Sequence, residues 1–120
     1  MTNRQRLIKI AEKYIGVTEK GGDNRGPEVE LFQKAVDGVA VGEAWCLAFV
    51  QYCVKQVDLE LDSEANMTRS VGRSLLFKTE HVMTLWNNTP KECRVSAGDV
   101  QEGDLILWQF YKNGKPTANG

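Results

Sequence analysis

The residues of this chain that are best suited to nucleophilic catalysis are its three cysteines, Cys46, Cys53 and Cys93. Cys46 falls in the first turn of a predicted helix, where unsatisfied N–H groups and the positive end of the helix dipole stabilise a thiolate. Cys53 lies two turns later on the predicted core face, and Cys93 lies in a charged loop, so we expect neither to react. By position alone, Cys46 is equally well read as a nucleophile or as a buried helix cysteine.

A cysteine nucleophile needs a general base, and the chain has a single histidine, His81. It lies in the segment TEHVMTLW, residues 79–86, which we interpret as a short helix. We expect His81 to be a surface or half-buried helix residue. Catalytic partners meet in space rather than in sequence, so its position does not exclude a role beside Cys46.

Two helices are predicted before the Cys46 segment. Apolar residues recur at three- and four-residue steps and end at Gly16, a typical helix stop; they are Leu7, Ile8, Ile10, Ala11, Tyr14 and Ile15. A loop at residues 21–27 then ends in Pro27, a favourable first residue for a second helix that ends at Gly38. Its core face is predicted to hold Val29, Phe32, Ala35 and Val36.

The third predicted helix is the central one and places Cys46 in its first turn. Its predicted core face consists of Cys46, Phe49, Val50, Cys53, Val54 and Val57. The polar residues 58–66 predict a loop, and Thr68 is a candidate cap for a short helix running past Val71 and Leu75.

The last third of the chain has strand character. Residues 100–104 predict a turn, residues 105–111 (LILWQFY) favour a strand, and Asn113-Gly114 is a strong hairpin signal. We expect the partner strand to begin a few residues later, with Gly120 reached before the sheet is complete. The unpaired strand would then be left at a sheet edge.

Composition limits the class of protein. A chain of 120 residues with 42% hydrophobic and 26% charged residues predicts one globular domain over residues 1–120. A net charge of −1 provides no basic field for nucleic acid, and no apolar run is long enough for membrane insertion. Three cysteines without a CxxC pair favour free thiols in a reducing compartment over a disulfide framework or a zinc site.

Three segments in order resemble the CHAP family, the cysteine- and histidine-dependent amidohydrolases and peptidases related to NlpC-type cell-wall peptidases. They are IGVTE with NRGPEV (residues 15–19 and 24–29), AWCLAFV (residues 44–50) and GDLI (residues 103–106). The second is similar to the family's nucleophile segment, and the third is similar to the Gly-Asp turn that opens its first central strand.

The resemblance implies an α+β, papain-like fold with N-terminal helices packed on a small antiparallel sheet, which is incomplete in this chain. It implies that Cys46 attacks an amide carbonyl of peptidoglycan through an acyl-enzyme, with its backbone N–H in the oxyanion hole. The family's histidine begins the strand after the Gly-Asp strand, which here would fall just beyond Gly120. We therefore expect the chain alone to be inactive or very slow. The alternative is a degenerate, noncatalytic wall-binding or structural domain.

Three further residues are candidates for the cleft that the resemblance implies. Trp45 would form a cleft wall or plain core, Glu43 would line the groove or favour the helix start, and Asn24 would shape the cleft or a turn. No cofactor and no metal are expected. The acidic residues near the second helix lack the alternating pattern of a calcium-binding loop. We therefore interpret them as solvated charges at a helix start rather than as calcium ligands.

The route to the cell wall is not encoded at the start of the sequence. Residues 1–16 alternate cationic and apolar residues and lack the apolar run of a secretory signal. We expect synthesis in the cytoplasm, with action on the wall after release as a phage lysin or after delivery by a secretion or tail apparatus. The bond that is cut and the oligomeric state stay open.

Overall fold

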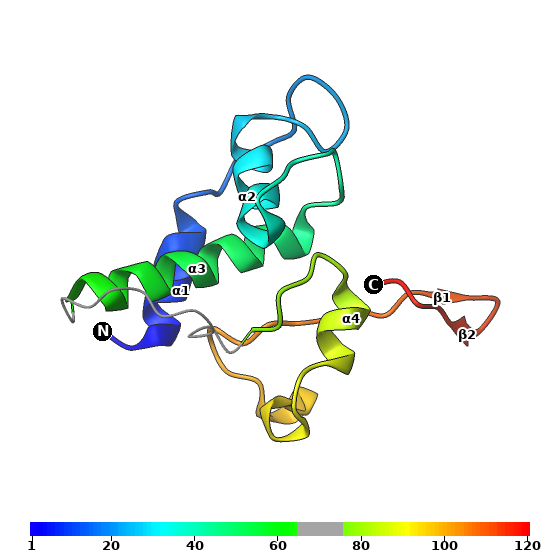
Figure 1. Ribbon diagram of the computed structural model, residues 1–120. Coiled ribbons are helices and arrows are strands. Elements are labelled where there is room, and N and C mark those ends of the chain that lie inside the picture. The colour runs from blue at the N-terminus through cyan, green and yellow to red at the C-terminus, as the bar shows by residue number, and fades with distance from the viewer. Residues whose placement is uncertain (65–75) are drawn as a thin grey trace.

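The computed structural model describes residues 1–64 and 76–120, and it is a mixed α+β structure with a small share of strand (Figure 1). Its elements are, in order, α1 (Asn3–Glu12), α2 (Pro27–Asp37), α3 (Cys46–Glu64), α4 (Val82–Asn87), η1 (Lys91–Cys93), η2 (Ala97–Asp99), β1 (Tyr111–Lys112) and β2 (Lys115–Pro116). The expected helix at Thr68, with Val71 and Leu75, falls outside the described residues.

Helix α1 begins with a capping box. The Thr2 hydroxyl accepts a hydrogen bond from the Gln5 backbone N–H at 3.1 Å, and the Gln5 side chain accepts one from the Thr2 N–H at 2.8 Å. The predicted face is confirmed at Ile10, which is 4% exposed. It is wrong at Ile15, which lies beyond the end of the helix and is 82% exposed.

Helix α2 agrees with its prediction at both ends. Pro27 is its first residue, and Gly38 ends it in the left-handed conformation at φ 87°. A residue with a Cβ is strained at this φ, which is why glycine is favoured after a helix. The predicted face is buried at Val29, Phe32 and Ala35, of which Val29 and Phe32 are fully inaccessible, and it is half-buried at Val36.

Helix α3 begins at Cys46, as predicted, but it continues to Glu64, so the predicted loop from residue 58 is wrong. Polar composition misled the prediction because this end of α3 packs against α1. Arg6 of α1 donates to both carboxylate oxygens of Glu64, at 2.8 and 2.7 Å, and lies 3.4 Å from Glu60. The predicted core face of α3 is confirmed at Cys53 and Val57.

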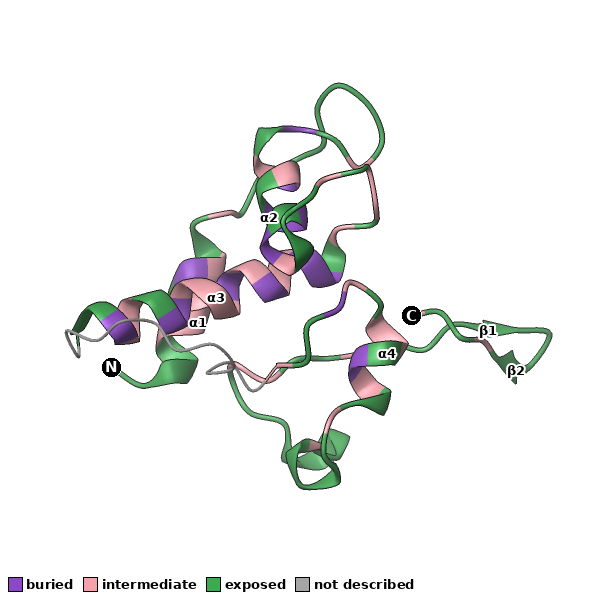
Figure 2. Ribbon diagram, viewed as in Figure 1, coloured by how far each residue is buried: buried purple, intermediate pink, exposed green. Residues whose placement is uncertain are grey.

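The core lies where α1 and α2 pack on α3 (Figures 1 and 2). Aromatic rings fill it: Phe32 contacts the rings of Tyr14, Trp45, Phe49 and Tyr52, with centroids 5.0–6.0 Å apart. The hydroxyls of Tyr14 and Tyr52 are 2.8 Å apart. Burial, followed by this contact, raises the pKa of Tyr52 to about 12.

The C-terminal part of the chain ends in a hairpin. Tyr111 pairs with Pro116 and Lys112 with Lys115, and positive φ at Asn113 (54°) and Gly114 (73°) matches the predicted type I′ turn. The partner strand β2 begins directly after the turn, whereas the sequence predicted a start a few residues later. Of residues 105–111, only Tyr111 belongs to a strand.

The resemblance implies N-terminal helices packed on a sheet, and the described residues show a different arrangement. Helices α1 and α2 each pack on α3, and the hairpin lies away from these three helices (Figure 1). Both of its strands are two exposed residues long, so the hairpin has no buried face on which a helix could pack. The Cα radius of gyration is 15.3 Å, against about 13.6 Å for a compact chain of this length.

The predicted Gly-Asp turn is present and is bound to the start of α1. Arg4 donates to the Glu102 carbonyl at 3.0 Å and pairs with the Asp104 carboxylate. Gly103 has φ 88°, and a Cβ at this position would lie 2.9 Å from the Arg4 Cβ. This contact joins the first helix to a turn about 100 residues later in the sequence.

The predicted helix at residues 81–86 is α4. Its Leu85 is 1% exposed, and the preceding segment is held by Gln51 of α3, whose side-chain amide donates to the carbonyls of Phe77 and Thr79. Among the described residues, no helix is long and apolar enough to cross a membrane.

Candidate functional site

The site is built around Cys46, the first residue of α3. The carbonyl of Trp45 accepts the first hydrogen bond of this helix, from the Phe49 N–H at 2.9 Å, which makes Trp45 the N-cap. The N–H groups of the first turn have no acceptor within the helix and concentrate positive partial charge at this end. Cys46 is exposed and free, so the reading as a buried helix cysteine is wrong.

The other two thiols are placed as expected. Cys53 is 2% exposed in the core, and burial raises its pKa to about 11. Cys93 is exposed on the three-residue helix η1 and does not lie at the start of a long helix. Cys46 is thus the one cysteine of the three that combines exposure with the start of a long helix.

Trp45 is half-buried and joins three parts of the chain. Its ring stacks on Phe32 of α2, with centroids 6.0 Å apart and an interplanar angle of 23°. Its indole N–H donates to the Glu19 carboxylate at 2.9 Å. The ring contact agrees with the interpretation of Trp45 as a core residue, and its role as a cleft wall stays a prediction.

Asn24 and Glu43 are brought together by a residue that the sequence reading passed over. The fully buried side-chain amide of Gln33, on α2, donates to the Asn24 carbonyl at 3.0 Å and to the Glu43 carbonyl at 2.7 Å. The Asn24 side chain adds a bond to the Gly42 carbonyl at 3.2 Å. The loops before α2 and before α3 are thereby fixed to each other beside the Cys46 segment.

Gln33 carries a signal that was available in the sequence. It stands between the buried Phe32 and Ala35, so helical spacing places a polar amide on or beside the core face of α2. A buried amide must find hydrogen-bond partners, and loop carbonyls next to a helix are the nearest ones.

Asn24 and Glu30 have local structural roles at the loop before α2 and at the start of α2. Asn24 takes positive φ (55°), a conformation that asparagine tolerates in turns. Glu30 accepts a hydrogen bond from the Gly26 N–H at 3.1 Å, which is the behaviour of a helix-start acid.

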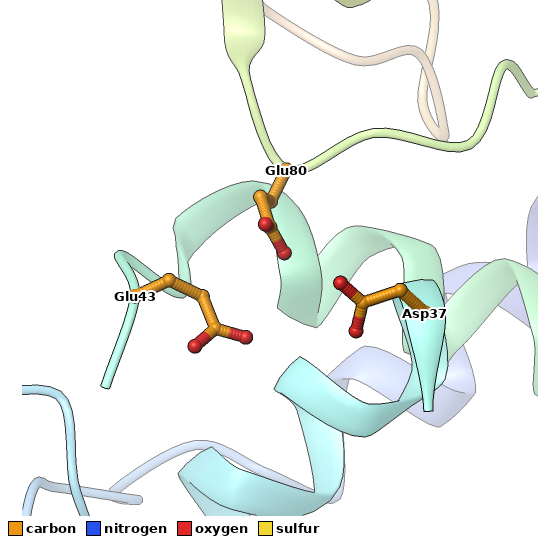
Figure 3. Close-up of side chains that lie close together, drawn as sticks. All are labelled: Asp37, Glu43 and Glu80. Atoms are coloured by element: carbon orange, nitrogen blue, oxygen red, sulfur yellow. The ribbon is translucent and has the colours of Figure 1, made fainter. Parts of the chain in front are cut away.

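Glu43 belongs to a group of three carboxylates with Asp37 and Glu80. One oxygen of each lies within 4.8 Å of the others. The three side chains point toward one another from the end of α2, the loop before α3 and the segment before α4 (Figure 3). Burial, and then the charges of Asp37 and Glu43, raise the pKa of Glu80, while neighbouring His81 lowers it.

Some oxygens of these three carboxylates have no hydrogen-bond donor among the described residues. Glu43 accepts from the Val41 N–H at 2.7 Å, but its other oxygen and one oxygen of Glu80 are buried without a hydrogen-bond partner among the described residues. Oxygen ligands in this arrangement suit a hard cation, although clustered surface acids are common without one.

His81 is exposed and forms the N-cap position of α4. Its backbone N–H donates to the Thr79 hydroxyl at 3.1 Å. Within residues 1–64 and 76–120, no hydrogen bond joins the His81 side chain to Cys46. The geometry thus supplies an exposed cysteine at a helix start, with no histidine hydrogen-bonded to it among the described residues.

Comparisons with known proteins add no relative, since no family model, no curated protein and no solved structure matches this chain.

Proposed function

We propose that this chain carries the nucleophile of a CHAP-like, papain-like cysteine hydrolase that cleaves an amide bond in peptidoglycan. The observation that supports this most directly is the exposed Cys46 as the first residue of the long helix α3, directly after Trp45. This is the position in which the resemblance implies a nucleophile.

In the proposed reaction, the Cys46 thiolate attacks the amide carbonyl carbon, and the backbone N–H of Cys46 donates to the developing oxyanion. The C–N bond breaks, the amine leaves with a proton, and a thioester to Cys46 remains. Water then hydrolyses the thioester and restores the thiol. The proton transfers require a base.

Among the described residues no histidine is hydrogen-bonded to Cys46, and this determines what we expect the chain to do on its own. Without a histidine hydrogen-bonded to Cys46, acylation by an activated ester is feasible, because such a leaving group needs no proton. Cleavage of an amide, whose amine must be protonated, should be very slow. Trp45, Glu43 and Asn24 are proposed to border the substrate groove, with no metal or cofactor required.

The test compares wild-type protein with Cys46→Ser. With a p-nitrophenyl ester, the proposal predicts a burst of one nitrophenol per chain and a matching acyl adduct on Cys46 by intact-mass and peptide analysis. Cys93→Ser is the matched control and should keep the burst. A burst that survives in Cys46→Ser, or is lost in Cys93→Ser, contradicts the assignment.

A noncatalytic wall-binding domain is the second candidate, and it is favoured by the lack of a base beside Cys46 among the described residues. Cosedimentation with purified peptidoglycan separates the two proposals. Binding that is equal in wild type and Cys46→Ser, with no esterase burst, supports the noncatalytic domain. A Cys46-dependent burst supports the hydrolase.

A further inference from the structure

The segment between the Gly-Asp turn and the hairpin presents apolar side chains to solvent. Ile106, Trp108 and Phe110 are 67%, 72% and 59% exposed, and they alternate along the chain. In Figure 1 this stretch runs almost straight into β1, and Figure 2 shows it as mostly exposed. Residues 105–111 contain no charge that would keep another apolar strand away.

The hydrogen bonds of Phe110 define which backbone edge is free. Its N–H donates to the Asn119 carbonyl at 2.9 Å, and its carbonyl accepts from the Thr117 N–H at 2.8 Å. In an antiparallel ladder, residues that face the partner alternate with residues that face away. Gln109 and Tyr111 therefore direct their N–H and C=O groups to the outer edge of the hairpin.

The chain also exposes more surface than a compact monomer of its mass. Its accessible surface is 8367 Å² for 13.5 kDa, whereas a folded monomer of that mass exposes about 6,500 Å². The excess of roughly 1,800 Å² is larger than the roughly 800 Å² that each partner buries in a standard protein interface. The chain as a whole therefore leaves more surface unburied than one side of a standard interface requires.

We propose that the outer edge of residues 105–111 pairs antiparallel with the same segment of a second copy, with Trp108 on the two-fold axis. In this register Ile106 faces Phe110 of the second copy, so apolar side chains meet on one face. Gln109 faces Leu107 of the second copy. The backbone N–H and C=O groups of both residues point to the free edge, so they can hydrogen-bond to each other.

Charge and apolar pairing together select this register over its neighbours. It places Asp104 of each copy opposite Lys112 of the other at both ends of the pairing. A shift of two residues, which preserves the pleat, would set Lys112 opposite Ile106 in one direction. In the other direction Lys112 would face Glu102, but Phe110 would then face the charged Asp104. Asp104 already pairs with Arg4, and its carboxylate has lone pairs left for a second cation.

Disulfide trapping tests the register directly. In a Cys46→Ser, Cys93→Ser background, Trp108→Cys should crosslink rapidly, because facing Cα atoms at such positions lie about 4.5 Å apart, inside the range for a disulfide. Gln109→Cys is the matched control, since its counterpart faces Leu107, and it should stay uncrosslinked. Equal crosslinking of both variants, or none of either, would overturn the proposal.

Sedimentation equilibrium supplies the second measurement. Wild-type protein should show a monomer–dimer equilibrium, and Trp108→Glu should be monomeric because two carboxylates would meet on the axis. Val41→Glu changes another exposed apolar residue, 74% accessible and outside the segment, and should dimerise like wild type. A wild-type protein that stays monomeric, or a Val41→Glu protein that loses the dimer equally, would overturn the proposal.

Discussion

The side-chain amide of Gln33 donates a hydrogen bond to the backbone carbonyl of Glu43 over 2.7 Å. Gln33 is fully buried in α2, and Glu43 stands three residues before Cys46, so this bond fixes the approach to α3. The same amide also donates to Asn24. Two loops of the candidate site are thus positioned by one residue of the core rather than by contacts of their own.

Replacing Gln33 with methionine should lower the free energy of unfolding by about 1–3 kcal/mol, because two buried carbonyls lose their donor while side-chain volume is nearly kept. Urea unfolding measures the change. Lys34→Met alters the next, exposed residue of the same helix and should change stability by less than about 0.5 kcal/mol. Equal effects of the two substitutions would show that Gln33 is not the link between the loops.

Gly103→Ala should be destabilising by about 1–3 kcal/mol, since a non-glycine residue at positive φ is strained. The new Cβ would also press on Arg4 at 2.9 Å. Gly98→Ala is the matched control, because Gly98 has no positive φ and nothing within 4 Å of its Cβ position. Thermal unfolding that leaves both variants at the wild-type midpoint would contradict the contact between the turn and α1.

Glu80→Gln should increase stability at neutral pH. Burial and the charges of Asp37 and Glu43 raise the Glu80 pKa in the folded chain, so its ionised form is disfavoured there more than in the unfolded chain. Stability from this group is therefore fully present below the ordinary glutamate pKa of about 4.3 and is lost as pH rises through the raised folded value.

Urea unfolding curves should be measured from just below the ordinary glutamate pKa of about 4.3 up to neutral pH. The difference in unfolding free energy between Glu80→Gln and wild type should grow as pH rises. Glu92→Gln, on the exposed η1, should give no such trend. An advantage for Glu80→Gln that is constant with pH would mean that titration of the carboxylate group is not its cause.

Cys53 should resist alkylation in the folded protein, because it is 2% exposed and burial raises its pKa to about 11. Modification followed by peptide mass analysis should label Cys46 and Cys93 in native buffer and Cys53 only when urea unfolds the chain. Labelling of Cys53 at the rate of Cys93 in native buffer would contradict the packing of α1 on α3.

The helices could be predicted where apolar periodicity and end signals coincide. Pro27, Gly38 and the start at Cys46 were all placed correctly, because a proline or glycine at a helix end acts locally. The continuation of α3 past residue 58 could not be read from composition, since it depends on Arg6 of another helix. The same holds for the site, where Gln33 acts on carbonyls nine and ten residues away.

The strand prediction failed for a related reason. Residues 105–111 have high strand propensity, but a strand forms only where a neighbour supplies hydrogen bonds, and in the single chain that neighbour reaches only part of the segment. Propensity identifies residues able to pair, and the available partner determines which of them do.

The most direct test of the central claim is the rate of alkylation at Cys46, measured with Cys93 as the reference thiol within the same folded chain. Both are exposed, but only Cys46 begins a long helix. The account predicts that iodoacetamide modifies Cys46 at least about tenfold faster than Cys93, because the first turn of a helix favours a reactive thiolate. Equal rates for the two cysteines would contradict it, and Cys46 would then be an exposed residue without catalytic activation.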